Sequence, residues 1–150
     1  MSFPAVPLKT VAVYGSRRQD GHIASIIAFL DSLMEAGVDV YIEKKLALLL
    51  NEEGYRLKVH GIRECTALPA HTDMVVSIGG DGTFLRASKW IGPLERPIIG
   101  INTGHLGFLA ENSIEDAPEI IDALKEGKYD RERRLVLEVS TPSIPEKEWP

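Results

Sequence analysis

Short apolar runs alternate along the chain with longer stretches in which apolar residues recur every three or four positions. The short runs predict buried strands, and the longer stretches predict amphipathic helices. The expected strands are 10–14, 38–42, 74–78, 97–101 and 135–139, and the expected helices are 23–36, 45–51, 83–90 and 114–125. Because the strands are separated by helices, we expect an α/β fold with a doubly wound, mainly parallel sheet.

Turn residues and charges mark the ends of several of these elements. Gly37 follows the first helical stretch, and Gly127 follows the last one, which has acidic residues early and Lys125 late, as suits the helix dipole. The segment 54–72 shows only weak alternation and several turn residues. We therefore expect a mobile excursion there, without a clear strand or helix.

Composition narrows the class of protein. With 150 residues, 44% hydrophobic and 26% charged, the chain is long enough for one globular core and too short for two full domains. No apolar run approaches the roughly 20 residues of a membrane span, and the amino terminus does not resemble a signal peptide, so we expect a cytoplasmic protein without membrane partners. The formal net charge of −5 argues against a nucleic-acid partner. The single cysteine, Cys65, fits a structural thiol better than a nucleophile.

The sequence Gly79-Gly80-Asp81-Gly82-Thr83 lies between the strand 74–78 and a helical pattern. Its three glycines let phosphate oxygens approach the main-chain N–H groups, and Thr83 is expected to cap the next helix, whose amino-terminal end attracts anions. Loops at the carboxyl ends of parallel strands are where open α/β sheets bind ligands. We therefore predict phosphate contacts at Gly79, Gly80 and Gly82.

Asp81 is the anomaly in this loop, because a carboxylate repels phosphate unless it grips a substrate hydroxyl or a metal ion. Both roles belong to phosphoryl transfer. A plain tight turn is the alternative, but the flanking strand and helix favour a ligand loop. Neither of the common Gly-rich nucleotide motifs is present. Arg86 and Lys89 follow as possible donors to an anionic nucleotide, although Lys89 fits a solvated helix charge better.

Together with 100–109, Gly-Ile-Asn-Thr-Gly-His-Leu-Gly-Phe-Leu, the glycine loop resembles the amino-terminal domain of the NAD kinases over roughly residues 10 to 140. The first motif alone also resembles diacylglycerol and sphingosine kinases, with a variant in phosphofructokinases, whereas the second is far more specific. The resemblance implies a phosphofructokinase-like α/β domain. It also implies transfer of a phosphoryl group from ATP or polyphosphate to the 2′-hydroxyl of the adenosine ribose of NAD, which yields NADP.

The same resemblance implies roles for individual residues. Asp81 would be the catalytic residue that engages the ribose hydroxyl, with Gly80, Gly82 and Thr83 beside the phosphates. Arg86 would contact NAD, and Phe108 and Leu109 would flank the adenine, although both could instead be core residues. His105 fits a turn residue, and Asn51-Glu52 precedes the glycine loop, so it is not the Asn-Glu pair of the family's second domain.

No separate metal cage is visible in the sequence, so we expect no protein metal site and a Mg²⁺ ion that arrives with ATP. The expected domains are 1–127, the α/β nucleotide-binding domain, and 128–150, the start of a truncated β-rich domain whose first strand is 135–139. We expect the full-length protein to form homo-oligomers and the 150-residue fragment to be inactive. A lipid or sugar kinase, and a nucleotide-binding module without turnover, remain the alternatives.

Overall fold

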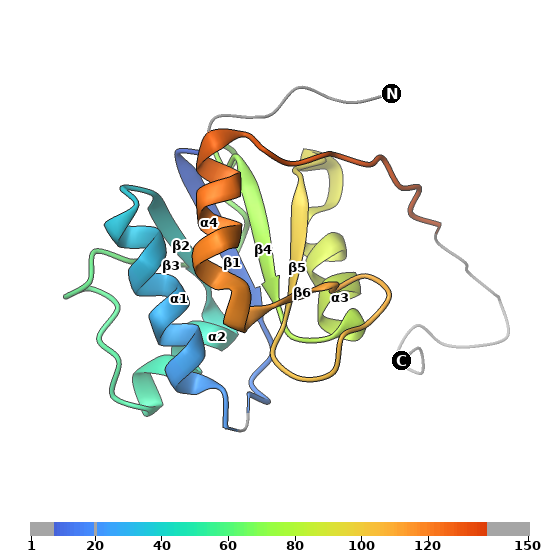
Figure 1. The fold of residues 1–150 in the computed structure, drawn as a ribbon. Helices are drawn as coiled ribbons and strands as arrows, with labels where there is room; N and C mark the ends of the chain where they lie inside the picture. The colour runs from blue at the N-terminus through green and yellow to red at the C-terminus, as the bar shows by residue number, and fades with distance from the viewer. Residues whose placement is uncertain (1–7, 20, 138–150) are drawn as a thin grey trace, which may run out of the picture.

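The computed structural model describes residues 8–19 and 21–137, which form one parallel sheet covered by helices on both faces (Figure 1). The strands are β1 (Thr10–Gly15), β2 (Asp39–Glu43), β3 (Arg63–Cys65), β4 (Met74–Ile78), β5 (Ile98–Asn102) and β6 (Asn112–Ser113). Their order in the sheet is β3-β2-β1-β4-β5-β6, and every pairing is parallel. The predicted α/β fold class is confirmed.

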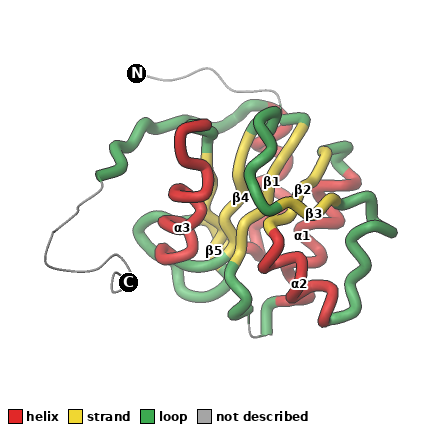
Figure 2. The backbone as a smooth tube through the Cα atoms, turned by 180° about the vertical axis from the view of Figure 1, so that it is seen from behind, coloured by secondary structure: helices red, strands yellow, loops and turns green. Residues whose placement is uncertain are grey.

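The helices divide between the two faces. The α-helices are α1 (Ile23–Glu35), α2 (Lys44–Glu52), α3 (Asp81–Ile91) and α4 (Ala117–Glu126), with short 3₁₀ turns η1 (Gly92–Leu94) and η2 (Ile114–Asp116). The larger core cluster joins α1, α2 and α4 to one face of the sheet. The smaller cluster joins α3 and Leu68 to the other face, which Figure 2 shows from behind.

The central strands explain why their positions could be predicted. Val11, Ala12 and Val13 of β1 and Val75 and Val76 of β4 have no exposed surface. A parallel strand that is covered on both faces gives a continuous apolar run in the sequence, so the pattern marks it clearly. The strand expected at 74–78 is confirmed, and the four expected helices are present with small shifts at their ends.

The structure corrects the expectation that the segment 54–72 has no clear strand. This segment contains the edge strand β3, which pairs with β2, and its side chains Tyr55, Leu57 and Ile62 are buried in the larger core cluster. The sequence pattern missed β3 because Arg63 and Glu64 are exposed, so a strand of three residues carries no apolar alternation. The strand β6 was missed because its two residues are too few to show any alternation.

The strand expected at 135–139 does not form over 135–137, where Leu135, Val136 and Leu137 are 90%, 81% and 83% exposed. A strand needs a neighbour to accept and donate its backbone hydrogen bonds, and no strand of the described residues lies beside this one. Residues 138 and 139 lie outside the described part, and the boundary at 127/128 stays a prediction. Among the described residues, no helix has the length and apolar character to cross a membrane.

Candidate active site

The sheet order places a topological switch point between β1 and β4. The chain proceeds from β1 outward to β2 and β3 on one side, and from β4 outward to β5 and β6 on the other. The connections that leave the carboxyl ends of β1 and β4 therefore diverge, and open α/β sheets bind ligands in the crevice between such connections. The predicted glycine loop begins directly after β4 and thus lies at this point.

The glycine loop turns sharply from β4 into α3. Gly79 is buried, has φ of 148° and donates its N–H to the carbonyl oxygen of Ile101 at 2.9 Å. A Cβ atom at this position would lie 2.6 Å from Oγ1 of Thr83, so both the backbone angle and the available space require glycine. The loop thus passes close beneath the first turn of α3.

Thr83 does not cap α3, which corrects the prediction. The helix begins at Asp81 with Gly80 as its N-cap, because Gly80 has extended angles that start the helix two residues earlier. Thr83 is 5% exposed, and its hydroxyl accepts a hydrogen bond of 3.2 Å from the guanidinium of Arg86. Accepting this bond leaves the O–H of Thr83 free to donate, and the first turn of a helix also leaves main-chain N–H groups without helical partners.

The carboxylate of Asp81 holds the second motif. Its Oδ2 accepts a bond of 3.0 Å from the N–H of Phe108, and its Oδ1 accepts bonds of 3.0 and 3.2 Å from Leu109 and Ala110. These backbone donors, Leu109 first, lower the pKa of Asp81. We call this set of three bonds the Asp81 clamp. It brings together the two motifs that the sequence singled out, and sequence reasoning did not foresee it.

Two glycines of the second motif make the clamp possible. A Cβ atom at Gly107 would collide with the Asp81 carboxylate, lying 2.6 Å from Cγ and 2.8 Å from Oδ2. A Cβ atom at Gly100 would lie 2.7 Å from Cα of Ala110 and 2.9 Å from the carbonyl oxygen of Leu109. All four distances are well below ordinary van der Waals contact, so the close approach of the loop depends on the absence of side chains at both glycines.

The loop presents apolar side chains to solvent beside the clamp. Phe108 is 91% exposed, so the alternative that it is a core residue is wrong, and Leu109 is partly buried. Leu106 and Leu85 are also exposed, at 62% and 60%. Arg86 lies one turn along α3 with its side chain partnered by Thr83, whereas Lys89 lies in the last turn.

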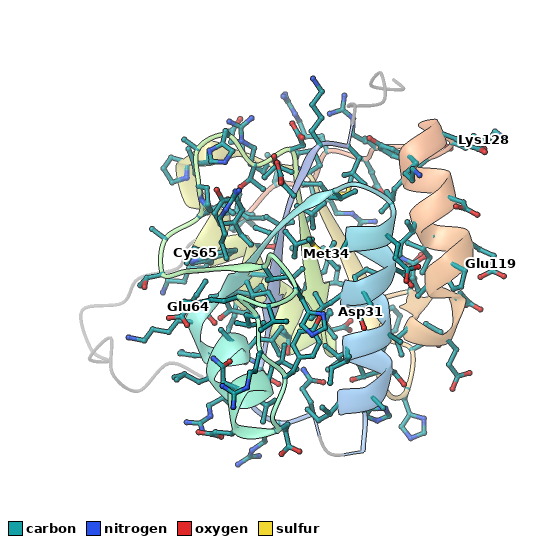
Figure 3. The ribbon with its side chains drawn as sticks, turned by 90° about the vertical axis from the view of Figure 1, so that its left-hand side faces the viewer. Asp31, Met34, Glu64, Cys65, Glu119 and Lys128 are labelled. Atoms are coloured by element: carbon teal, nitrogen blue, oxygen red, sulfur yellow. The ribbon has the colours of Figure 1, made fainter. Side chains whose placement is uncertain are left out.

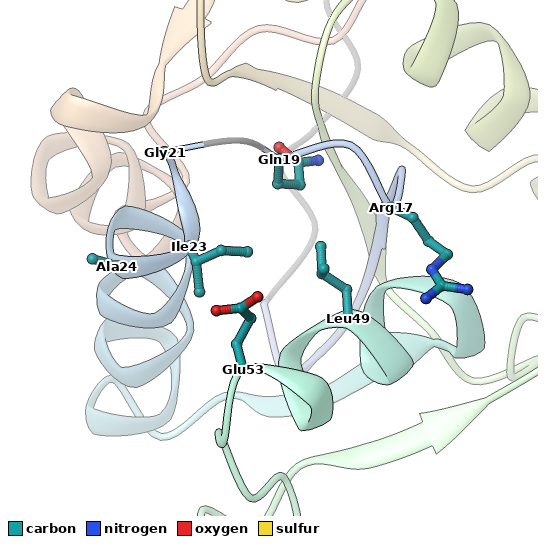
Figure 4. Close-up of a pocket in the computed structure, with 7 residues that line it drawn as sticks. All are labelled: Arg17, Gln19, Gly21, Ile23, Ala24, Leu49 and Glu53. Carbon is teal, nitrogen blue, oxygen red and sulfur yellow. The ribbon is translucent and has the colours of Figure 1, made fainter.

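A cavity of about 380 Å³ lies between the start of α1 and the end of α2 (Figure 4). It is lined by Arg17, Gln19, Gly21, Ile23, Ala24, Leu49 and Glu53, and it does not include Asp81. Beside it, Arg17 forms an exposed ion pair of 2.9 Å with Glu52. Asn51 and Glu52 are thus exposed on α2.

Cys65 ends the edge strand β3. Figure 3 shows it with Glu64 on the side of the molecule away from Glu119 and Lys128. Burial first, and then the charges of Glu43 and Glu64, raise the pKa of its thiol to about 11. This environment suits a structural thiol rather than a nucleophile.

Over residues 8–19 and 21–137, no three His, Cys, Asp or Glu side chains come close enough together to hold a metal ion.

Comparison with known proteins agrees with this geometry. Residues 19–129 match the family model of the ATP-NAD kinase N-terminal domain. An NAD kinase of Porphyromonas gingivalis is 40% identical over 134 residues, which are 89% of this chain and 46% of that protein. An NAD kinase of Paraburkholderia phytofirmans is 32% identical over 130 residues, or 87% of this chain and 42% of that protein. The chain thus spans about half the length of the curated relatives it matches.

A solved structure shows the same fold. Yeast NADH kinase in complex with NADH superposes with a TM-score of 0.68 over 83% of this chain and 40% of that one, at 19% sequence identity. The parallel sheet, the glycine loop at its switch point and the family match over 19–129 lead to one conclusion. The chain belongs to the NAD kinase family.

Proposed function

We propose that this chain is the part of an NAD kinase that holds the reacting hydroxyl of NAD, so that ATP phosphorylates the 2′-oxygen of the adenosine ribose. The observation that carries the proposal is the Asp81 clamp, which joins the two family motifs at the carboxyl edge of the sheet. A carboxylate in that place can accept a hydrogen bond from a substrate hydroxyl next to the phosphate-binding turn.

Asp81 has capacity left for a substrate. Its Oδ2 accepts one bond from the described residues, and a carboxylate oxygen offers two lone pairs, so a ribose hydroxyl can donate to the second. A carboxylate with a lowered pKa is a weak base, but phosphoryl transfer passes through a loose transition state that needs alignment and only late proton removal. As the new O–P bond forms and the nucleoside diphosphate departs, the hydroxyl proton passes to Asp81.

The neighbouring residues supply further parts of the proposed site. Gly80 and Gly82 are exposed, and a Cβ atom at Gly80 would meet nothing within 4 Å, so phosphates can approach the turn. The amino-terminal end of α3 adds a field that favours an anion. Arg86 contributes a fixed positive charge, and the exposed Phe108 with Leu109 offers an apolar surface for the adenine.

We propose that the divalent metal ion belongs to the phosphate donor. Because the described residues offer no cluster of metal ligands, we assign no step to a protein-bound ion and predict that Mg²⁺ arrives with the phosphates of ATP. Polyphosphate as a second donor, homo-oligomer formation and a cytoplasmic location also remain predictions. Since the relatives are about twice as long as this chain, we predict that the 150 residues alone bind nucleotide without turnover.

A substrate panel tests the proposal. The full-length protein is incubated with ATP and Mg²⁺ and, in separate reactions, with NAD, diacylglycerol, sphingosine or fructose 6-phosphate, and every product is identified by mass spectrometry. We expect NADP as the main product. A phosphorylated lipid or sugar with no NADP would assign the protein to the kinases that share only the glycine loop, and tight nucleotide binding without any product would indicate a binding module.

A further inference from the structure

Gln19 is a buried polar residue that neither family motif includes. It follows β1, is 3% exposed, and its side-chain amide has a partner for each polar atom. The Nε2 group donates to the carbonyl oxygen of Ile78 at 3.1 Å and to that of Ser16 at 3.3 Å. Its Oε1 accepts a bond of 3.2 Å from the hydroxyl of Thr103. The two carbonyl acceptors fix which end of the amide carries the nitrogen.

These three bonds join the ends of three strands. Ser16 follows β1, Ile78 is the last residue of β4, and Thr103 follows β5. The partners are 59 and 84 residues from Gln19 in sequence, so the side chain ties together segments that the chain itself does not connect closely. Gln19 thus spans the switch point between β1 and β4.

The glycine loop and the loop of residues 103–110 both begin next to residues that these bonds hold. The peptide group between Ile78 and Gly79 is held from two sides, since Gln19 donates to its oxygen and its nitrogen donates to Ile101. Asp81 follows two residues later. On the other side, Thr103 begins the segment that ends with the three N–H donors of the Asp81 clamp.

Packing around Gln19 is incomplete on one side. Gln19 also lines the cavity of about 380 Å³ in Figure 4, so the hollow beside it leaves room for neighbouring groups to shift. The hydrogen bonds of its amide therefore add to the ladder pairings of Ile78 with Gly15 and Ile101 in holding the ends of β4 and β5 near the loop after β1.

We propose that Gln19 is a positioning residue for phosphoryl transfer, which sets the placement of Asp81 relative to the loop of residues 103–110. The proposal rests on the proposed NAD kinase function. Without the amide, the two loops remain folded, but the carboxylate and its three donors lose their common anchor. A displacement of about 1 Å at a reacting group can cost on the order of 100-fold in rate, so the effect belongs in kcat rather than in substrate binding.

Three variants of the full-length protein separate the contributions. Gln19→Met removes all three bonds at similar volume, Gln19→Glu keeps the acceptor for Thr103 but loses both donations, and Thr103→Val removes the third bond alone. Ile26→Val is the control, because Ile26 is fully buried in α1 and its truncation lowers stability through the core alone. We expect kcat to fall at least about 10-fold in both Gln19 variants and less in Thr103→Val, with the KM for NAD changed less than about threefold.

Amide hydrogen exchange gives a readout that does not require activity. In Gln19→Met we expect at least about tenfold faster exchange at Phe108, Leu109 and Ala110 than in Ile26→Val under conditions of matched global stability. Equal exchange in these two variants, or a fall in kcat no larger than that of Ile26→Val, would overturn the proposal. If the wild-type protein forms no NADP, the proposed function fails, and the exchange measurement still decides whether Gln19 holds the loop.

Discussion

The substitution Gly107→Ala would test whether the Asp81 clamp matters for the reaction. A Cβ atom at residue 107 would lie 2.6 Å from Cγ of Asp81, and ordinary carbon contacts begin near 3.5 Å. The carboxylate or the loop must therefore move by about 1 Å. Because the clamp bonds measure 3.0 to 3.2 Å, a shift of this size would break at least one of them.

The expected result is a loss of catalysis with little loss of folding. A misplacement of about 1 Å predicts a fall in kcat on the order of 100-fold for NADP formation by the full-length protein. Gly104→Ala is the matched control in the same loop, since its Cβ atom would meet only Oδ1 of Asn102, at an ordinary 3.8 Å. Both changes stiffen the unfolded chain equally, so this effect on stability cancels in the comparison.

The assay measures kcat and KM for NAD in both variants, together with thermal unfolding. We expect Gly104→Ala to stay within about twofold of wild type, because its new methyl group displaces nothing. If Gly107→Ala matches Gly104→Ala in kcat while both are folded, then the position of the Asp81 carboxylate does not control the rate, and the clamp is only a structural contact.

Three further predictions concern stability and reactivity. The pKa of Asp81 is lowered in the folded state, so the clamp stabilises the protein at pH values above the ordinary carboxyl pKa of about 3.9. This stabilisation is lost as the pH falls through the lower pKa of the folded state. Acid titration below about pH 4 should therefore destabilise wild type more than Asp81→Asn. Ser77→Ala should leave the free energy of unfolding within about 1 kcal/mol of wild type or raise it in urea titrations, since the buried hydroxyl has no hydrogen-bond partner among the residues that the structure describes. A loss above about 2 kcal/mol would reveal such a partner. Cys65, with a thiol pKa of about 11, should react with iodoacetamide at pH 8 on the order of 100-fold more slowly than free cysteine, and a comparable rate would contradict the assigned burial.

The sequence predicted the parts of this fold that carry strong local patterns. The buried strands β1 and β4 and the amphipathic helix α1 appear directly as apolar runs and helical spacing, because burial on one or both faces dictates those residues. The strands β3 and β6 have three and two residues and are formed by pairing with a neighbour, so no local pattern could reveal them. The expected strand at 135–139 failed for the converse reason, since alternation without a partner does not make a strand over 135–137.

For the candidate site, the motifs identified the residues but not their contacts. The glycines at 79, 100 and 107 could be noted in the sequence, yet their necessity depends on Thr83, Ala110 and Asp81 approaching from elsewhere in the chain. No sequence pattern marks Gln19, because its three hydrogen-bond partners lie up to 84 residues away along the chain. Thr83 was assigned to the wrong position because a glycine can begin a helix as readily as a hydroxyl residue can.

The most direct test of the central claim is the rate of NADP formation from NAD, ATP and Mg²⁺ by the full-length protein, compared between wild type and Asp81→Asn. Asparagine keeps an oxygen that can accept from Leu109 and Ala110, but it turns an NH2 group toward the N–H of Phe108, so it removes the proton acceptor together with one bond of the clamp. We predict rapid NADP formation by wild type and a fall of at least about 100-fold in the variant, while NAD binding measured by calorimetry stays within several-fold. A variant that keeps more than about a tenth of the rate, or a folded wild type that forms no NADP, would contradict the role given to Asp81.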